Sequence, residues 1–188
     1  MFARTPRLLL RPGWIQDAPA VFELIRDEAI VRNLSTPPWP YRLADAEAFL
    51  SAERHSGEPV MLIFRRTQGA PELVGSIGFG RDPNGQMELG YWIGRAFWGR
   101  GYATEAGRAA IAMARDSFRL TKLKAGHFVD NPASGRVLEK LGFRRTSMVV
   151  PRHSARRGQA SPSQQFELDL GEGDVMAQSR TSAEMMAA

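Results

Sequence analysis

The sequence predicts one α+β domain, with a mixed and mostly antiparallel central sheet of about six to seven strands flanked by about four helices. Three observations predict this class. Several β-rich runs end in turn residues, helical patterns lie between them, and strands and helices do not alternate strictly, which disfavours a doubly wound parallel sheet. We expect the domain to occupy residues 1–170 and the weakly patterned residues 171–188 to form a loose C-terminal tail.

The first half of the chain is expected to open with one strand and two helices. The β-rich run RLLLRPG at 7–13 ends in a proline and a glycine, which terminate strands. Asp17 can cap a helix whose apolar residues, through Ala29, share one stripe, and the proline-rich run STPPWPY at 35–41 must break it. A second short helix is expected over 44–54.

The middle of the chain is expected to form three consecutive strands. The β-rich runs PVMLIFRR at 59–66 and ELVGSIGFG at 72–80 are separated by a short segment rich in turn residues, which predicts a hairpin. The tetrapeptide DPNG at 82–85 is typical of a turn, and the run QMELGYWIG at 86–94 predicts the strand that follows it.

The second half of the chain mixes helices and strands. Small residues within 104–118 predict a helix that can pack closely on a sheet. Asn131 is expected to cap another helix, with Pro132 at its first position and Gly142 at its end. The remaining strands are expected over 122–129, 144–150 and 164–170.

Composition limits the class of protein. The hydrophobic fraction of 43% and the charged fraction of 24% are ordinary for a soluble globular protein, and no run of about 18 apolar residues predicts a membrane span. The N-terminal segment lacks the apolar region and cleavage site of an export signal, and the absence of cysteine excludes disulfides and thiolate metal sites. We therefore expect a cytoplasmic protein with no membrane partner.

Basic residues give the chain a formal net charge of +5, carried mainly by arginine. This balance is compatible with nucleic acid, an acidic partner or a phosphate-rich ligand, and also with a solvated surface of mixed charge. The densest cluster, Arg152, Arg156 and Arg157, lies near Pro151 and before the run GQASPSQ, so we expect it on a mobile loop. Because no recognition helix or aromatic-stacking motif accompanies it, nucleic acid is expected to be at most a weak partner.

The run FWGRGYATEA at 97–106 carries two glycines between a predicted strand and a predicted helix. Glycines allow successive main-chain N–H groups to converge, and a helix N-terminus adds partial positive charge, so this arrangement is typical of a phosphate site. The run lacks the Lys-Ser/Thr pair of a nucleotide P-loop and the third glycine of a dinucleotide fingerprint, which disfavours ATP and NAD. Taken alone, it is equally compatible with a structural glycine turn.

Two linked motifs make the phosphate interpretation more specific. The stretch ELGYWIGRAFWGRGYATEA, followed by DNPASGRVLEKLGF, resembles the GNAT family of acetyl-CoA-dependent N-acetyltransferases, and especially the branch that acetylates the N-termini of ribosomal proteins. The resemblance follows the order of elements over about residues 6–170 and is specific over about 88–143. It implies the GNAT fold, whose central sheet is splayed in the middle.

The resemblance also implies how acetyl-CoA, the expected cosubstrate, is bound. In the family's loop pattern Gln/Arg-x-x-Gly-x-Gly/Ala, Gly101 and Ala103 match, whereas Trp98 replaces the polar first residue. Loop amides would hold the pyrophosphate, the strand YWI would offer free backbone groups to pantetheine, and Asn131 would contact the cofactor besides capping its helix. The implied cofactor-binding residues are Tyr91, Trp92, Ile93, Trp98, Gly99, Arg100, Gly101, Tyr102, Ala103, Thr104 and Asn131.

The implied chemistry is direct transfer of acetyl to an amine, through a tetrahedral species and without a metal. Many relatives use a tyrosine as the acid where this chain has Leu138, so another group must serve. Ser134 matches the serine proposed as the acid in the ribosomal-protein branch, although a serine in a first helical turn can also bond locally. Glu88 is the expected base, directly or through water, although a solvated ion is the more ordinary role of a glutamate at a strand edge.

Other polar and aromatic residues have ordinary structural explanations. Glu105 is expected to be a carboxylate stabilised by the helix N-terminus, and His127 a packed or partly exposed residue. The histidines His55, His127 and His153 lie far apart in the sequence, so we expect no metal site. Three aromatic residues could line the acceptor pocket or pack in the core: Trp39, Tyr41 and Trp92.

Three hypotheses about function remain open at this point. The acceptor is a protein N-terminus, or it is a small amine such as an antibiotic, a polyamine or an amino acid. Alternatively, the chain is a non-catalytic acyl-CoA-binding module. The sequence also leaves open whether the protein is a monomer or a homodimer.

Overall fold

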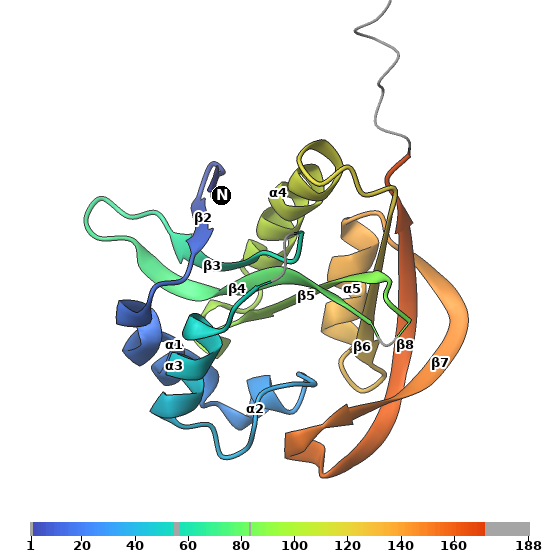
Figure 1. The fold of residues 1–188 in the computed structure, drawn as a ribbon, viewed down its shortest axis with the longest axis horizontal. Coiled ribbons are helices and arrows are strands. Elements are labelled where there is room, and N and C mark those ends of the chain that lie inside the picture. The colour runs from blue at the N-terminus through green and yellow to red at the C-terminus, as the bar shows by residue number, and fades with distance from the viewer. Residues whose placement is uncertain (1, 55–56, 83, 172–188) are drawn as a thin grey trace, which may run out of the picture.

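The computed structural model describes residues 2–54, 57–82 and 84–171. Within these ranges an eight-stranded sheet has the order β1-β2-β3-β4-β5-β6-β8-β7 (Figure 1). The strands are β1 (Ala3–Arg4), β2 (Leu8–Pro12), β3 (Val60–Arg65), β4 (Glu72–Arg81), β5 (Met87–Ile93), β6 (Lys122–Phe128), β7 (Arg144–Ser154) and β8 (Gln159–Asp169). Neighbours are antiparallel except β5 and β6, which are parallel. The predicted α+β class and mostly antiparallel sheet are confirmed, and β1 is an additional short strand.

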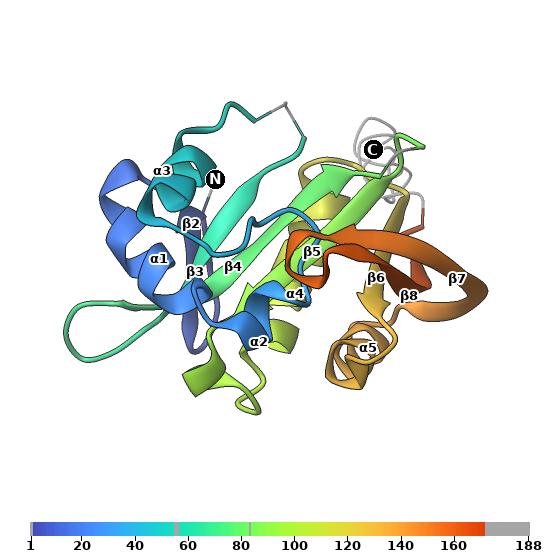
Figure 2. The same ribbon diagram turned by 90° about the horizontal axis from the view of Figure 1, so that it is seen from below.

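The helices are α1 (Ala18–Ile25), α2 (Glu28–Val31), α3 (Leu43–Ser51), α4 (Tyr102–Asp116) and α5 (Pro132–Lys140). The first three contribute to the core on one face of the sheet, and α4 and α5 contribute to the core on the other face (Figure 2). The predicted first helix is divided in two, because Asp27 accepts a hydrogen bond from the Ala29 amide at 2.8 Å and so caps the separate helix α2. No helix within the described ranges is long and apolar enough to cross a membrane.

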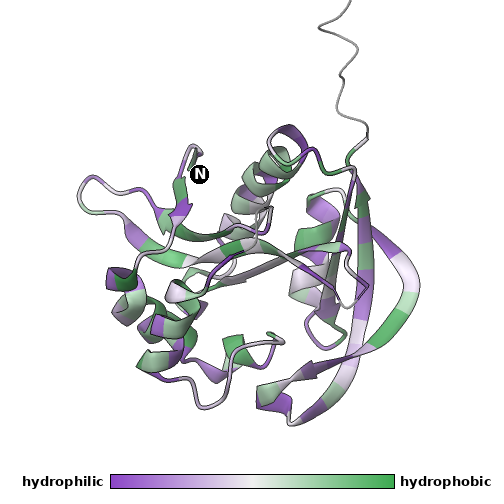
Figure 3. Cartoon of the chain, viewed as in Figure 1, coloured by the Kyte–Doolittle hydropathy of each residue, from purple (hydrophilic) through white to green (hydrophobic). Residues whose placement is uncertain are grey.

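The core is densest under the central strands. Most residues of β3 and β4 are buried, and Figure 3 shows apolar residues running through these strands. On α4, Ala106, Ala110 and Ala114 are 0% exposed, as expected for a helix that packs closely on a sheet. The close fit holds the beginning of α4 in a fixed position relative to β5.

Strands β5 and β6 lie side by side only where they begin. Their one registered pair is Glu88 with Lys124, whereas β4 pairs with β5 from Met87 to Ile93. Beyond that pair β5 and β6 diverge, and the main-chain groups of residues 90–93 that face β6 have no neighbouring strand. We call this side of β5 the splayed edge. The splay in the middle of the sheet is therefore confirmed.

The arginine cluster lies in a long hairpin. β7 continues to Ser154 and β8 begins at Gln159, so Arg152 is a strand residue and the other two arginines lie in the tight turn between the strands. Pro151 does not end β7, because β7 is the last strand of the described sheet and its outer side needs no hydrogen-bond donor. The prediction of a loop is therefore wrong for Arg152, whereas Arg156 and Arg157 do lie in the connection between two strands.

Candidate active site

Two glycines form the turn that leads from β5 into α4. After one short 3-10 turn (Arg95–Phe97), Gly99 has a φ of +76° and Gly101 a φ of +77°. Gly101 is the N-cap of α4 and has no side chain with which to cap it. Since only glycine adopts this left-handed region at little cost, these two residues give the turn its shape.

The main-chain N–H groups of this turn have no acceptors in the described part of the chain. None of the amides of residues 99–104 donates a hydrogen bond there, and the amide of Glu105 is the first that does, to the Gly101 carbonyl oxygen at 3.0 Å. We call residues 99–104 the amide turn. Uncommitted donors at a helix N-terminus form a positive end that suits an anion. The structure thus brings the predicted phosphate-binding residues together, and the ligand itself stays a prediction.

Residues 91–93 of β5 are predicted to hold pantetheine, and two of these three residues direct their main-chain N–H and C=O groups to the splayed edge. The Gly94 amide donates to the Val74 carbonyl oxygen at 2.8 Å, and hydrogen-bonding direction alternates along an antiparallel strand. Trp92 therefore directs its main-chain groups to β4, whereas Tyr91 and Ile93 direct theirs to the splayed edge. This differs from the expectation that all three residues keep free backbone groups.

Trp98, which replaces the polar residue of the family pattern, lies against the end of the splayed edge. Its indole N–H donates to the Ile93 carbonyl oxygen at 2.6 Å, while 48% of the residue stays exposed. Neither the indole N–H nor that carbonyl is then free for a cofactor. Among the described contacts, the groups left at the end of the strand are the N–H and C=O of Tyr91 and the N–H of Ile93.

The side chain of Tyr91 contacts Ser134 where β5 faces the start of α5. The two hydroxyl oxygens are 2.7 Å apart, and the Tyr91 hydroxyl also lies 3.3 Å from the Ser134 carbonyl oxygen. Burial raises the pKa of Tyr91 to about 12, and the bond to Ser134 opposes this only in part. The phenol is therefore neutral near pH 7 and can donate. The sequence predicts a role only for the backbone of Tyr91, because no local pattern links its hydroxyl to Ser134.

The first turn of α5 is fixed as the sequence predicts. Asn131 is its N-cap, and its side-chain oxygen accepts from the Ser134 amide at 3.4 Å, while Pro132 occupies the first helical position. Leu138, where many relatives have a tyrosine, is 1% exposed in the apolar core. The phenol that lies beside Ser134 therefore comes from the sheet, in Tyr91.

Glu88, the predicted base, takes part in an ion pair. Its Oε1 lies 2.7 Å from Nη1 of Arg152 on β7, and the two side chains are 16% and 27% exposed. Glu88 and Tyr91 are three residues apart on one strand, so their side chains point to opposite faces of the sheet. The structure does not bring Glu88 and Ser134 onto one face, and a reaction that uses both must take place where β5 and β6 diverge.

The turn of the β7–β8 hairpin reaches the helices on the Glu88 face. Arg156 forms an ion pair with Glu28 of α2, and its guanidinium lies 5.4 Å from the centroid of the Trp39 ring. Arg157 forms a second ion pair, with Asp130, at 2.7 Å. These contacts join the hairpin to α2 and to the segment after β6, and Figure 1 shows α2 beside the end of the hairpin.

Tyr41 and Trp92, for which the sequence leaves open an acceptor pocket or the core, pack in the core, and His127 packs against an aromatic ring. Tyr41 is 7% exposed in the core beneath α1–α3, and Trp92 packs against the same core. The His127 ring lies 5.4 Å from the Phe166 ring. Within the described residues no three His, Asp or Glu side chains are grouped to hold a metal ion, and His55 lies outside those residues.

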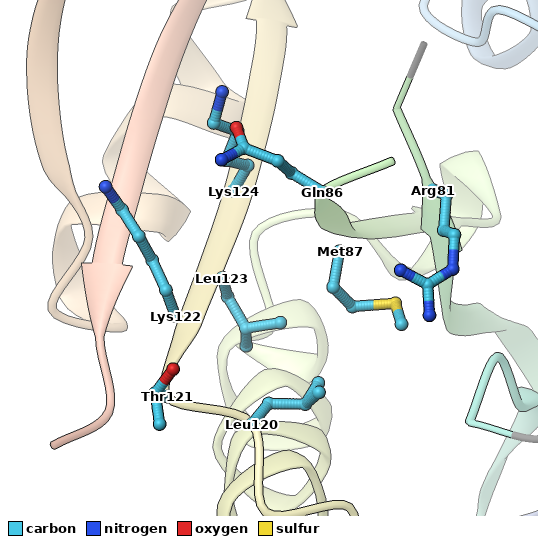
Figure 4. Close-up of a pocket in the computed structure, with 8 residues that line it drawn as sticks. All are labelled: Arg81, Gln86, Met87, Leu120, Thr121, Lys122, Leu123 and Lys124. Carbon is cyan, nitrogen blue, oxygen red and sulfur yellow. The ribbon is translucent and has the colours of Figure 1, made fainter. Parts of the chain in front are cut away.

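A cavity of about 240 Å³ lies at the other end of β5 and β6, where the two strands pair (Figure 4). Each cation on its wall already has a carboxylate partner: Lys122 has Glu167, Lys124 has Asp82 and Arg81 has Glu58. The cavity is therefore separate from the amide turn and the splayed edge, and it offers an anion no unpaired cation.

Comparisons with known proteins identify one family. The family model described as "Acetyltransferase (GNAT) domain" matches residues 7–144. The uncharacterized N-acetyltransferase YoaA of Bacillus subtilis (strain 168) is 29% identical over 152 residues, which cover 77% of this chain and 84% of that protein. The family match includes the amide turn, the splayed edge and the first turn of α5.

Two solved structures share the fold. The microcin C7 self-immunity acetyltransferase MccE, in complex with acetyl-CoA and AMP, aligns with a TM-score of 0.73 and 18% identity over 88% of this chain and 93% of its own. The ribosomal L7/L12 α-N-protein acetyltransferase RimL, in complex with coenzyme A, aligns with a TM-score of 0.72 and 18% identity over 90% and 98%. At this identity the likeness shows the fold alone.

Proposed function

Because the chain belongs to the GNAT family and is an N-acetyltransferase, we propose that it carries acetyl from acetyl-CoA to the N-terminal amine of a protein. The observation that carries the cofactor assignment is the amide turn, whose donors have no acceptors in the described chain. A diphosphate offers several anionic oxygens to such donors at a helix N-terminus. The complexes of MccE and RimL with acetyl-CoA and coenzyme A support the same cofactor.

The pantetheine arm is proposed to lie along the splayed edge. Its amides can pair with the N–H and C=O of Tyr91 and with the N–H of Ile93, as the backbone of an added strand would. From a diphosphate on the amide turn, this path runs back along β5 toward the Tyr91 hydroxyl and Ser134. The arm would thus bring the thioester to the point where β5 and β6 diverge.

Transfer proceeds by attack of the neutral amine on the thioester carbonyl carbon. The C–N bond forms, the C–S bond breaks, and the developing thiolate needs a donor. A thiol has an ordinary pKa of about 8.5, so complete proton transfer to it from a phenol of pKa about 12 is uphill by about 5 kcal/mol. We therefore propose that Ser134, supported by the Tyr91 hydroxyl, donates a hydrogen bond to the sulfur, which solvent later protonates.

Glu88 is proposed to accept the proton of the acceptor ammonium, directly or through one water. Its ion pair with Arg152 at 2.7 Å holds the carboxylate on the face of the sheet where the acceptor is proposed to enter. Because Arg152 already pairs with Oε1 of Glu88, a relay through one water is the arrangement that we favour. The region bounded by α2 and the β7–β8 hairpin lies on the same face and is the proposed entrance for the acceptor.

A screen that follows release of free thiol from acetyl-CoA tests this function. Peptides with the N-termini of ribosomal proteins would be run beside polyamines, amino acids and aminoacyl antibiotics. We expect the peptides to be acetylated with the highest kcat/KM, in line with the fold shared with RimL. A preference for a small amine would replace the acceptor assignment and leave the cofactor assignment standing.

A further inference from the structure

Arg7 lies in the turn between β1 and β2 and contacts the amide turn. Its Nη1 donates to the Arg100 carbonyl oxygen at 2.9 Å, and no other side chain of the described residues hydrogen-bonds the backbone of residues 99–104. Its Nε donates to Glu105 Oε2 at 2.6 Å, and its guanidinium lies 4.9 Å from the centroid of the Tyr102 ring. One side chain thus joins the N-terminal turn to three residues around the start of α4.

The hydrogen bond to Arg100 sets the direction of an amide. In a trans peptide the C=O and the N–H of one peptide unit point in opposite directions. Because Arg7 holds the Arg100 carbonyl on its own side, the N–H of Gly101, in the same peptide unit, points to the other side. Arg7 therefore orients one of the uncommitted donors on which the proposed phosphate site depends.

Glu105 holds Arg7 in place, and Arg7 in turn compensates the negative charge of Glu105. Its carboxylate lies in the first turn of α4, where it would repel a phosphate on the neighbouring amides. Both of its oxygens are turned to the β1–β2 turn, Oε1 accepting from Thr5 Oγ1 at 2.6 Å and from the Arg7 amide at 2.9 Å. Together with the Nε bond, these contacts compensate the negative charge beside the anion site. A structural role was predicted for Glu105 through the helix N-terminus, but its hydrogen-bond partners are Thr5 and Arg7.

One nitrogen of Arg7 has no protein partner among the described contacts. Nη2 donates no hydrogen bond there, and it lies 3.5 Å from the position that a Cβ on Gly101 would occupy. Half of the Arg7 side chain is exposed. A cationic donor at a helix N-terminus strengthens the attraction of that end for an anion.

We propose that Arg7, anchored by Glu105, is a positioning residue for the amide turn and makes it selective for the diphosphate-bearing part of coenzyme A. The inference rests on the proposed function. It adds to the phosphate site a residue of the β1–β2 turn, which is distant in sequence from the amide turn.

The test compares coenzyme A with pantetheine, which lacks the diphosphate and the nucleotide. For Arg7→Ala we expect the affinity for coenzyme A, measured by calorimetry, to fall by about tenfold or more, as for a lost hydrogen bond to a charged group. The affinity for pantetheine, measured by NMR titration, should change less than about twofold. Arg7→Lys should recover part of the affinity for coenzyme A, because it restores the charge without the planar fork. Equal losses for both ligands, or no loss for either, would overturn the proposal.

Arg66→Ala is the matched control. Arg66 donates to the carbonyl oxygens of Thr5 and Pro6 in the same turn but does not contact the amide turn. We expect it to leave the affinity for coenzyme A within about twofold of wild type. A wild-type protein that fails to bind coenzyme A would refute the proposed function itself, whereas a binding wild type with an unaffected Arg7→Ala variant would refute only the role of Arg7.

A double variant tests the charge argument separately. In Arg7→Ala, the Glu105 carboxylate loses its guanidinium and faces the phosphate uncompensated. Adding Glu105→Gln removes that charge and should restore about threefold or more of the lost affinity for coenzyme A. If the double variant binds coenzyme A no better than Arg7→Ala, compensation of Glu105 is not part of the role of Arg7.

Discussion

The amide turn and the region around Ser134 lie at the two ends of the proposed cofactor path and differ in how their polar groups are satisfied. The amide turn presents only N–H donors, and donors cannot pair with one another, so they stay uncommitted. At the other end Tyr91 bonds Ser134 and Glu88 bonds Arg152, because side chains of both kinds are present. The amide turn can therefore bind its ligand without breaking an internal hydrogen bond. The region around Ser134 must exchange internal hydrogen bonds for contacts with the substrate.

The largest expected effect is at the amide turn. Gly101→Glu places a negative side chain at a φ of +77°, where a side chain is strained, and beside the proposed diphosphate. We expect the affinity for coenzyme A, measured by calorimetry, to fall by about a hundredfold or more. Gly158→Glu is the control, because Gly158 has a similar φ of +67° in the hairpin turn with open space around it. Equal affinities of the two variants would contradict the placement of the diphosphate.

Side-chain changes in the region around Ser134, where acetyl transfer is proposed to occur, should separate cofactor binding from turnover. For Ser134→Ala we expect kcat to fall by about ten- to a hundredfold with little change in the affinity for coenzyme A, because one donor to the sulfur is lost. Tyr91→Phe should have a smaller effect of the same kind, and the double variant should be little worse than Ser134→Ala. The measurement is steady-state kinetics with the acceptor from the screen. Additive losses would mean that the two hydroxyls act independently.

Replacing the proposed base, Glu88, is expected to have a smaller effect on kcat/KM, and this effect should depend on pH. Glu88→Gln should lower kcat/KM by about tenfold at pH 7, because the acceptor ammonium must lose its proton. An N-terminal amine has a pKa of about 7.7 to 8.0, so the deficit should shrink above that range as the amine becomes neutral without help. A deficit that stays constant from pH 6.5 to pH 9.5, a range of roughly three units around that pKa, would assign Glu88 a structural role.

The smallest expected effect concerns stability at the amide turn. Burial raises the pKa of Glu105, but hydrogen bonds from Thr5 and Arg7 outweigh it and lower the pKa below the usual 4.5. The ionised Glu105 carboxylate therefore adds to the free energy of unfolding above pH 4.5. This contribution is lost as the pH falls through the lowered pKa and the carboxylate is protonated. Glu105→Gln should therefore be less stable than wild type at pH 7, by less than about 1 kcal/mol, and the difference should shrink as the pH falls below the usual pKa of 4.5. Denaturant titrations at several pH values would check this, and a difference independent of pH would exclude the charge of Glu105 as its source.

The two ends also differ in how much of them the sequence predicts. The glycine turn, the start of α4 and the Asn131 cap follow from local preferences, so short stretches of sequence predict them. The contact of Tyr91 with Ser134 depends instead on how β5 and α5 are packed. The same is true of Arg7 and the amide turn, whose partners come from opposite halves of the chain.

The errors of prediction have physical reasons as well. Helix α1 was expected to continue to Ala29, because the apolar stripe crosses the cap at Asp27 without interruption. Arg152 was expected on a loop, because a proline ordinarily ends a strand, but β7 is the last strand of the described sheet. Trp92 was expected to offer its backbone to the cofactor, but only the register with β4 decides which way each residue of β5 faces.

The most direct test of the central claim is the ¹⁵N–¹H spectrum of the protein titrated with coenzyme A and, separately, with pantetheine. We expect the amide signals of residues 99–104 to move downfield with coenzyme A, as their protons acquire phosphate acceptors, and to stay in place with pantetheine. Signals from this segment that do not respond to coenzyme A, while others elsewhere do, would show that the diphosphate lies somewhere else.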